Sequence, residues 1–305
     1  MGDRLISSAT IAQDQLENLH RLLRRGNGYG VAGPTWAEGK KKRPPPRPRD
    51  AKAAARKLVK RLTKHAHGDP GVLRIAETLR GCSRRRRCLH PACPKCGRAL
   101  QRLLVRLILR FLTTYPELGP WVAVSIILPP STANSAIDFD AERARYAGLL
   151  RAVGIDLGGF ALDLSFNEDD RRSRPESQRF APHACVHLYG LAPAAQVKAA
   201  LPKLKRFARS TEVVRRPVKR KRFDGNSAAI AYAFKPRFVR RLTIERAHPE
   251  RVNPVRTTRD RPLTVEQDLR AVRALDHVGL TGRLLLPGLS FEAALPARSR
   301  STPRT

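Results

Sequence analysis

Residues 160–167, FALDLSFN, and residues 183–190, HACVHLYG, are the two stretches that decide the fold. In both, apolar side chains alternate with polar or small ones, which is the period-two pattern of a β-strand with one buried face. The alternation places Asp163 on the polar face of the first strand. It places His183, Cys185, His187 and Tyr189 together on the polar face of the second. Residues 167–179 form a polar connection, so the sequence predicts two strands that both present polar groups.

The remaining elements are predicted outward from this pair. WVAVSIIL at residues 121–128 is a fully apolar, β-rich run that predicts a buried strand. A basic strand is expected over 212–223 and a loop-like segment over 241–264. Apolar periodicity predicts helices over 8–25, 51–64, 72–79, 99–111, 139–153, 195–208, 228–234 and 265–277. The fold class is therefore α+β, an antiparallel sheet with helices on one face, joined to a small helical module that carries four cysteines and to basic disordered tails.

The same pattern divides the chain into segments. The expected order is an N-terminal helix (1–25), a basic Pro/Gly linker (26–50), a helical module with the cysteines (51–118), the sheet domain (119–240) and a basic C-terminal extension with one helix (241–305). That last helix either packs, as its apolar stripe favours, or recognises a partner.

The charge balance points to a polyanionic partner. The chain has 305 residues, with 60 Lys+Arg against 26 Asp+Glu and a net charge of +34. This excludes an ordinary metabolic enzyme surface and favours nucleic acid, with an arginine-rich coding bias as the alternative. No apolar run approaches the ~20 residues of a membrane span. We therefore expect a cytoplasmic protein on nucleic acid, with no membrane partner.

Four of the five cysteines are clustered. Cys82-x5-Cys88-x4-Cys93-x2-Cys96 supplies four thiolates, with His90 as a spare ligand. Zn2+ takes four tetrahedral nitrogen or sulfur ligands, and a short Cys-x2-Cys turn presents two sulfurs to one ion. The sequence predicts a structural Zn2+ site, the alternative being free cysteines in a basic loop.

Three groups of cations are candidates for contact with nucleic acid. They occupy the cysteine loop, one face of the helix over 99–111 and the basic strand; they are Arg84, Arg85, Arg86, Arg87, Arg98, Arg102, Arg106, Arg215, Arg216, Lys219 and Arg220. Further along, the helix from Ala228 places Tyr232 and Lys235 three residues apart, on neighbouring positions of one face. A packed aromatic is the structural alternative for this tyrosine.

Taken together, these motifs resemble the bacterial plasmid rolling-circle replication initiators, the HUH-type endonucleases. Cys88…Cys93-Pro94-x-Cys96 is similar to their cysteine-bearing N-terminal part, FALDLSFN to their acidic strand, and FAPHACVHLYG (180–190) to their His-hydrophobic-His strand. AAIAYAFKP (228–236) is similar to their tyrosine motif. The resemblance covers about residues 80–240. It implies Tyr232 as nucleophile, Lys235 as its companion and Asp163 as a ligand of a catalytic ion.

One residue departs from the family pattern. Cys185 stands where the first metal histidine is expected, and thiolate is a poor ligand for Mg2+ or Mn2+. Either His183 compensates through a β-bulge, or the site is weakened or takes another metal. The implied ligands of Mg2+ or Mn2+ are therefore Asp163, His187 and either Cys185 or His183.

The resemblance implies a DNA-binding replication initiator that nicks single-stranded or hairpin DNA and meets the replication machinery. Two alternatives stay open. One is a non-catalytic nucleic-acid-binding zinc protein with a degenerate nuclease fold. The other is a transposase or mobilisation nuclease built on the same sheet.

Overall fold

The computed structural model describes residue 17 and residues 19–24, 48–129, 137–171, 174–248 and 251–289. Residues 19–24 are helical, in agreement with the helix expected over 8–25, and Leu19 and Leu23 are buried. The expectations for the remainder of that helix, for most of the linker and for the last residues of the chain fall outside the described ranges.

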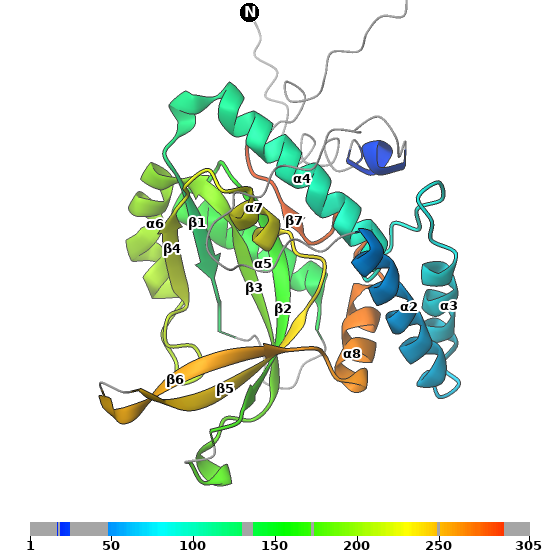
Figure 1. Cartoon of the computed structure of the whole chain (residues 1–305). Coiled ribbons are helices and arrows are strands. Elements are labelled where there is room, and N and C mark those ends of the chain that lie inside the picture. The colour runs from blue at the N-terminus through cyan, green and yellow to red at the C-terminus, as the bar shows by residue number, and fades with distance from the viewer. Residues whose placement is uncertain are drawn as a thin grey trace, which may run out of the picture.

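A seven-stranded sheet forms the centre of the molecule (Figure 1). Its strands follow the order β4–β1–β3–β2–β5–β6, with β7 also paired to β2. The bounds are Trp121–Ile126 (β1), Gly159–Asp169 (β2), His183–Pro193 (β3), Val218–Arg222 (β4), Val239–His248 (β5), Arg251–Arg261 (β6) and Leu284–Leu285 (β7). The two strands quoted above are direct neighbours, and Asp163 lies opposite His187.

The expected purely antiparallel sheet is wrong in one place. β2 and β5 run parallel, with Ser165 opposite Val239, so the sheet is mixed. A parallel pair needs a long crossover between its strands. Here the crossover includes β3, β4 and the helix that carries Tyr232. Sequence periodicity carries no information on the direction of pairing, which is why this was missed.

Helices cover both faces of the sheet, not one as expected (Figure 1). α5 (Phe139–Val153) and α6 (Ala194–Phe207) pack on the face that carries Phe160 and Leu162. α4 (Pro94–Thr114) and α7 (Ser227–Ala233) pack on the opposite face, against Ala161 and Leu191. The alternation in β2 hides this second core because its members on that face are small or polar.

The helical module consists of α2 (Pro48–Lys64), α3 (Pro70–Arg80) and the first half of α4. Asp69 caps α3 by accepting hydrogen bonds from Gly71 and Val72. α8 (Val265–Leu275) joins the module to the sheet domain and begins in a capping box between Thr264 and Gln267. Short 3-10 turns lie at Pro116–Leu118 and Glu176–Gln178. No helix in the described ranges is long and apolar enough to cross a bilayer.

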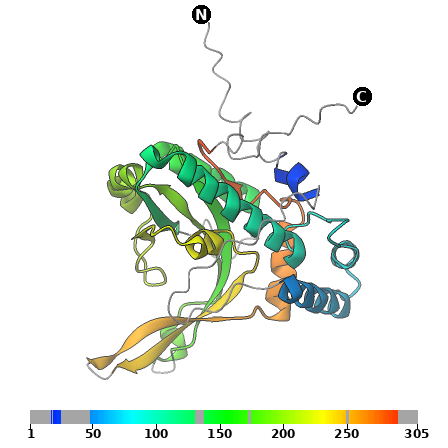
Figure 2. The same ribbon diagram turned by 45° about the horizontal axis from the view of Figure 1, so that its top comes forward.

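β5 and β6 form an antiparallel ribbon that extends beyond the other strands (Figures 1 and 2). The expectation of a loop over 241–264 is therefore wrong for most of that segment. The ribbon is rich in arginine and lacks a continuous apolar face, so its sequence reads as a solvated loop. Arg256 holds it to the loops before β3 and β4 by donating to the carbonyls of Glu212 and Val213 and by lying over the ring of Phe180.

Candidate active site and metal centre

The four cysteines meet at one point, as their spacing predicts. The sulfurs of Cys82, Cys88, Cys93 and Cys96 all lie within 4.8 Å of one another. The Cys82–Cys96 sulfur distance is 3.5 Å and the Cys88–Cys96 distance is 3.7 Å. A tetrahedron of 2.3 Å Zn–S bonds has edges of about 3.8 Å, so the cluster has the geometry of a closed zinc site.

His90 lies outside this cluster. Its Nδ1 accepts a hydrogen bond from the Ala92 amide at 3.1 Å, and its Nε2 faces Asp276 at 3.3 Å. The role of spare ligand is therefore wrong, because both ring nitrogens already have partners. The four thiolates leave no open position, so the site can support structure and not metal catalysis.

A second polar cluster lies between β2 and β3 and is almost fully buried. The carboxylate of Asp163 contacts Nζ of Lys235 at 2.6 Å and Nε2 of His187 at 3.1 Å. The exposed fractions of the Asp163 and His187 side chains are 2% and 5%. The β2–β3 register brings Asp163 and His187 together, and the segment that follows α7 supplies Lys235.

Electrostatics hold Asp163 and His187 in their charged forms. Burial by itself lowers the pKa of His187, but the negative charge of Asp163 outweighs burial and raises that pKa to about 9. Burial by itself raises the pKa of Asp163. The positive charges of His187 and Lys235 outweigh burial and hold the pKa of this carboxyl well below its usual range. The cluster is an imidazolium and an ammonium that share one carboxylate.

Tyr232 lies next to this cluster and is open to solvent. Its side chain is 45% exposed, although it is a large aromatic residue on a packed helix. Its ring meets the ring of Tyr189 edge-on, with the centroids 5.0 Å apart, and Nζ of Lys235 lies 4.9 Å from the ring centroid. The packed-core alternative for Tyr232 is therefore wrong. The ammonium of Lys235 contacts both the ring of Tyr232 and the buried carboxylate of Asp163.

Helix α4 fixes α7 and the segment that follows it. Gln101 donates a hydrogen bond of 2.6 Å to the carbonyl of Ala231, the residue before Tyr232. Gly97 lies against Pro236, the residue after Lys235, so closely that a Cβ at position 97 would stand 2.6 Å from the proline Cβ. Because Cys96 precedes Gly97, the cysteine cluster and the Tyr232–Lys235 pair are supported by the same turn of helix.

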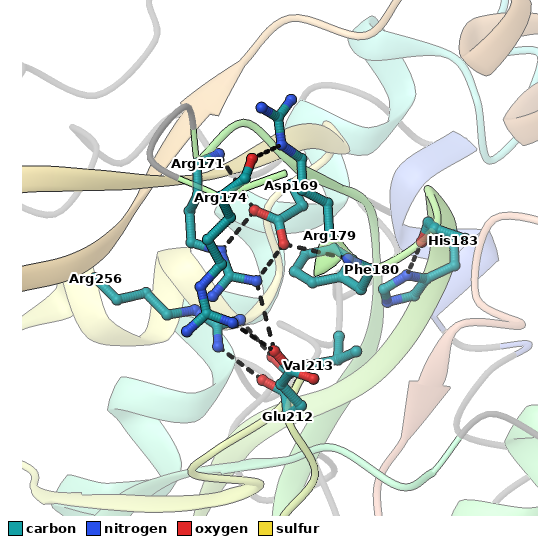
Figure 3. A network of polar contacts seen from close by, with 10 residues as sticks. Asp169, Arg171, Arg174, Arg179, Phe180, His183, Glu212, Val213 and Arg256 are labelled. Atoms are coloured by element: carbon teal, nitrogen blue, oxygen red, sulfur yellow. Dashed lines mark hydrogen bonds and ion pairs between the residues drawn. The ribbon is translucent and has the colours of Figure 1, made fainter. Parts of the chain in front are cut away.

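The structure separates His183 from this site. β2 and β3 pair in unbroken register from Gly159 to Asn167, so the bulge that would move His183 toward His187 is absent from β3. The His183 ring instead donates to the carbonyl of Ala181 at 3.0 Å and lies against Phe180 (Figure 3). Cys185 lies closer, two residues before His187 in β3, and its thiol contributes to the raised pKa of His187.

These residues do not fit a divalent cation. In the described part of the chain, the cysteine cluster is the one group of three or more His, Cys, Asp or Glu side chains whose ligand atoms converge. The carboxylate that a metal would need already carries an ammonium and an imidazolium. Mg2+ and Mn2+ also prefer several oxygen ligands, and this cluster offers a single carboxylate. Such a cluster attracts an anion more readily than a second cation.

Two further cations near Asp163 were not predicted from the sequence. Arg283 is buried, donates to the Leu162 carbonyl at 2.9 Å and has its pKa lowered by burial to about 10. Arg241 projects from β5 near Tyr232 and Asp163 and pairs with Asp260. The one signal in the sequence is that Arg283 directly precedes the apolar run from Leu284 to Leu286.

The predicted nucleic-acid-binding cations differ in accessibility. Arg98 is buried and donates a hydrogen bond to Gln101 one turn along α4, so its expected contact with DNA is wrong. Arg87, half-buried, donates to the Lys95 carbonyl, and Arg102 and Arg106 are half-buried. The exposed members are Arg84, Arg85, Arg86, Arg215, Arg216, Lys219 and Arg220.

The register assigns the cations of β4 to opposite faces. Lys219 lies opposite Ser125, which lies opposite Tyr189, so Lys219 shares the face of Tyr232. Lys221 is two residues along on the same face, whereas Arg220 projects to the other. The edge of the sheet beside Tyr232 is therefore positively charged.

A third cluster ties together the loops at the far end of β2. Arg171 is completely buried and forms ion pairs with Asp169 and Glu212 (Figure 3). The Asp169 carboxylate also accepts from the Phe180 amide at 3.2 Å. Every acid in this cluster has an arginine partner, so the cluster fixes the loops and the base of the ribbon.

Comparison with known proteins identifies no relative. No family model matches the chain, and neither the curated proteins nor the solved structures include a match. The likeness to rolling-circle initiators therefore rests on the motifs, and the arguments below rest on the geometry.

Proposed function

We propose that this protein binds single-stranded DNA and breaks a phosphodiester bond with Tyr232, as the rolling-circle initiators that it resembles do. The observation that carries the proposal is the contact between an exposed phenol and Lys235, whose ammonium is held by a buried carboxylate. An exposed nucleophile beside fixed positive charge is the arrangement that phosphoryl transfer requires.

The proposed step forms one bond and breaks one. The phenol oxygen of Tyr232 attacks phosphorus as its proton leaves to solvent, and the bond from phosphorus to the 3′ oxygen breaks. The 3′ oxygen takes up a proton, and the 5′ phosphate stays on the tyrosine as an ester. Because a phenolate is a good leaving group, the 3′-OH can later reverse the step and rejoin the strand.

The surrounding residues supply charge and position. Lys235 contacts the ring of Tyr232, and Lys235 and His187 both pair with Asp163. These two cations would neutralise the developing charge on the phosphate oxygens. We propose no step through a divalent ion at Asp163. The Mg2+ or Mn2+ implied by the family remains a prediction, to be measured directly.

DNA would approach along the charged edge of the sheet. Lys219 and Lys221 share the face of Tyr232, and Tyr189 lies between β4 and the phenol. Backbone contacts of this kind are independent of sequence and weaken steeply with salt. The net charge of +34 supports the same partner.

The test is capture of a covalent adduct. A 5′-labelled and a 3′-labelled oligonucleotide are each incubated with the zinc-loaded chain, with and without added Mn2+. Transfer of the 3′-labelled fragment to the protein supports the proposal. Tyr232→Phe should abolish the adduct, while Tyr189→Phe, which removes the neighbouring hydroxyl, should retain it. An adduct that survives Tyr232→Phe contradicts the assignment.

A second candidate function is binding without cleavage. Two observations favour it. Cys185 stands at the position of the first metal histidine, and the Asp163 carboxylate is already paired with the ammonium of Lys235. If this second function is the correct one, the Tyr232→Phe variant binds single-stranded DNA as tightly as the wild type. The wild type then forms no covalent adduct with any divalent ion present.

A further inference from the structure

A cavity opens in the helical module, away from Tyr232. It lies between α2, α3 and the first turn of α4 and has a volume of about 500 Å³. This is within the range of small-ligand sites and several times the size of a phosphate group. Its apolar part consists of Ala55, Val59 and Leu79.

Apart from Thr63, the rest of the cavity wall is positively charged. Arg56, Lys60 and Lys64 project into it from successive turns of α2, about 6 Å apart along the helix axis. Arg80 from α3 and Lys95 from α4 complete the set, and no acidic residue lines the cavity. Among the described residues, the three α2 cations have no ion pair with a carboxylate; the one acid paired with Arg80 is Glu77, outside the lining.

The cysteine cluster holds part of this wall in place. Nζ of Lys95 donates to the carbonyl of Cys82 at 2.5 Å, and Lys95 lies between Cys93 and Cys96 in sequence. Arg80 ends α3 two residues before Cys82. Two of the five cations therefore depend for their position on the four thiolates and on the metal that they can hold.

We propose that this cavity is a second binding site for single-stranded DNA. The spaced cations fit successive phosphates of one strand, and the apolar part fits the sugars or base faces between them. No aromatic residue lines the cavity, so it offers no stacking platform and should bind without sequence preference. The choice of DNA as the polyanion rests on the proposed function; the site itself rests on the cavity and its charges.

The experiment measures affinity with a matched pair of charge variants. The zinc-loaded full chain is titrated into fluorescein-labelled oligodeoxythymidine, and anisotropy is recorded from low to moderate salt. Lys60→Gln with Lys64→Gln removes two cavity cations. Lys198→Gln with Lys203→Gln removes two exposed lysines of α6 and causes the same change of net charge.

The cavity variant should bind at least tenfold more weakly than wild type. The slope of log K against log salt should fall by about 1.4, since each phosphate contact with a single strand contributes about 0.7. The α6 variant should stay within twofold of wild type with an unchanged slope. Equal losses in both variants would overturn the proposal, as would unchanged binding by the cavity variant.

Two further arms separate this inference from the proposed function. An unlabelled duplex that competes as well as the single strand would overturn the single-strand assignment. Adduct formation is measured on the same proteins at saturating DNA, where the cavity variant should match wild type. If neither the wild type nor the variants form an adduct but the cavity variant binds DNA more weakly than the wild type, the proposed nicking activity is wrong and the second binding site is supported. Circular dichroism checks that both variants are folded.

Discussion

The cysteine cluster and the Asp163 cluster differ in how their parts meet. The four cysteines lie within fifteen residues and converge around one point. Asp163, His187 and Lys235 come from two strands and the end of a helix, and converge only when the sheet forms. The first cluster collects negative ligands for a cation. The second collects cations around a single carboxylate, which suits an anion. Two clusters of similar size thus have opposite electrostatic preferences.

The largest effect should follow loss of the metal. Structural Zn2+ contributes on the order of 10 kcal/mol to the folded state of small zinc modules. Cys96→Ala should therefore abolish stoichiometric zinc and unfold the module, measured by zinc content and thermal denaturation. Cys185→Ala, outside the cluster, is the matched control and should keep its zinc. Equal zinc content in the two variants would contradict the assignment.

The next largest effect should follow removal of the buried acid. Asp163→Ala leaves Lys235 and His187 without their shared partner and should cost about 3–5 kcal/mol in urea unfolding. Asp260→Ala breaks the Arg241 pair, where the acid is 53% exposed, and should cost less than about 1 kcal/mol. Similar losses of unfolding free energy in the two variants would mean that the buried cluster contributes no more to stability than an exposed ion pair.

The pH dependence of stability should reflect His187. Its folded pKa of about 9 lies above the ordinary value of 6.5, so its stabilisation is complete below pH 6.5 and disappears as the pH rises through 9. The expected loss between these limits is on the order of 3 kcal/mol. Urea unfolding at several pH values measures it, and His187→Gln should remove this component. A variant with the wild-type slope would show that other groups cause the dependence.

A smaller effect should test the link between the two clusters. Alanine normally stabilises a helix interior relative to glycine by about 0.5–1 kcal/mol. At Gly97 the added methyl would meet Pro236, so Gly97→Ala should instead destabilise by about 1–2 kcal/mol and lower adduct yield. Gly148→Ala on α5, where nothing lies within 4 Å of the added Cβ, should stabilise. If alanine increases the free energy of unfolding at both positions, Pro236 moves away from α4 at little cost and the prediction is wrong.

Local pattern predicted a large part of this molecule. The spacing of the cysteines, the alternation of β2 and β3 and the periods of α2 to α8 are properties of short windows, and the elements lie close to where they were expected. The polar face shared by Asp163 and His187 also follows from alternation, because directly opposed residues share a face. The strands of the ribbon were missed because arginine-rich strands lack an apolar period.

What the sequence determined by itself is a polycation with a thiolate cluster, an alternating strand pair and a tyrosine–lysine helix end. Only the tertiary structure decided that the sheet is mixed, that Arg98 is buried and that His183 turns away. It also decided that Lys235, not a third metal ligand, meets Asp163. The physical reason is the distance along the chain over which residues interact. Spacing in the sequence fixes contacts within one helical turn or one strand. Whether a buried acid meets a cation or another metal ligand depends on which distant segment packs over it.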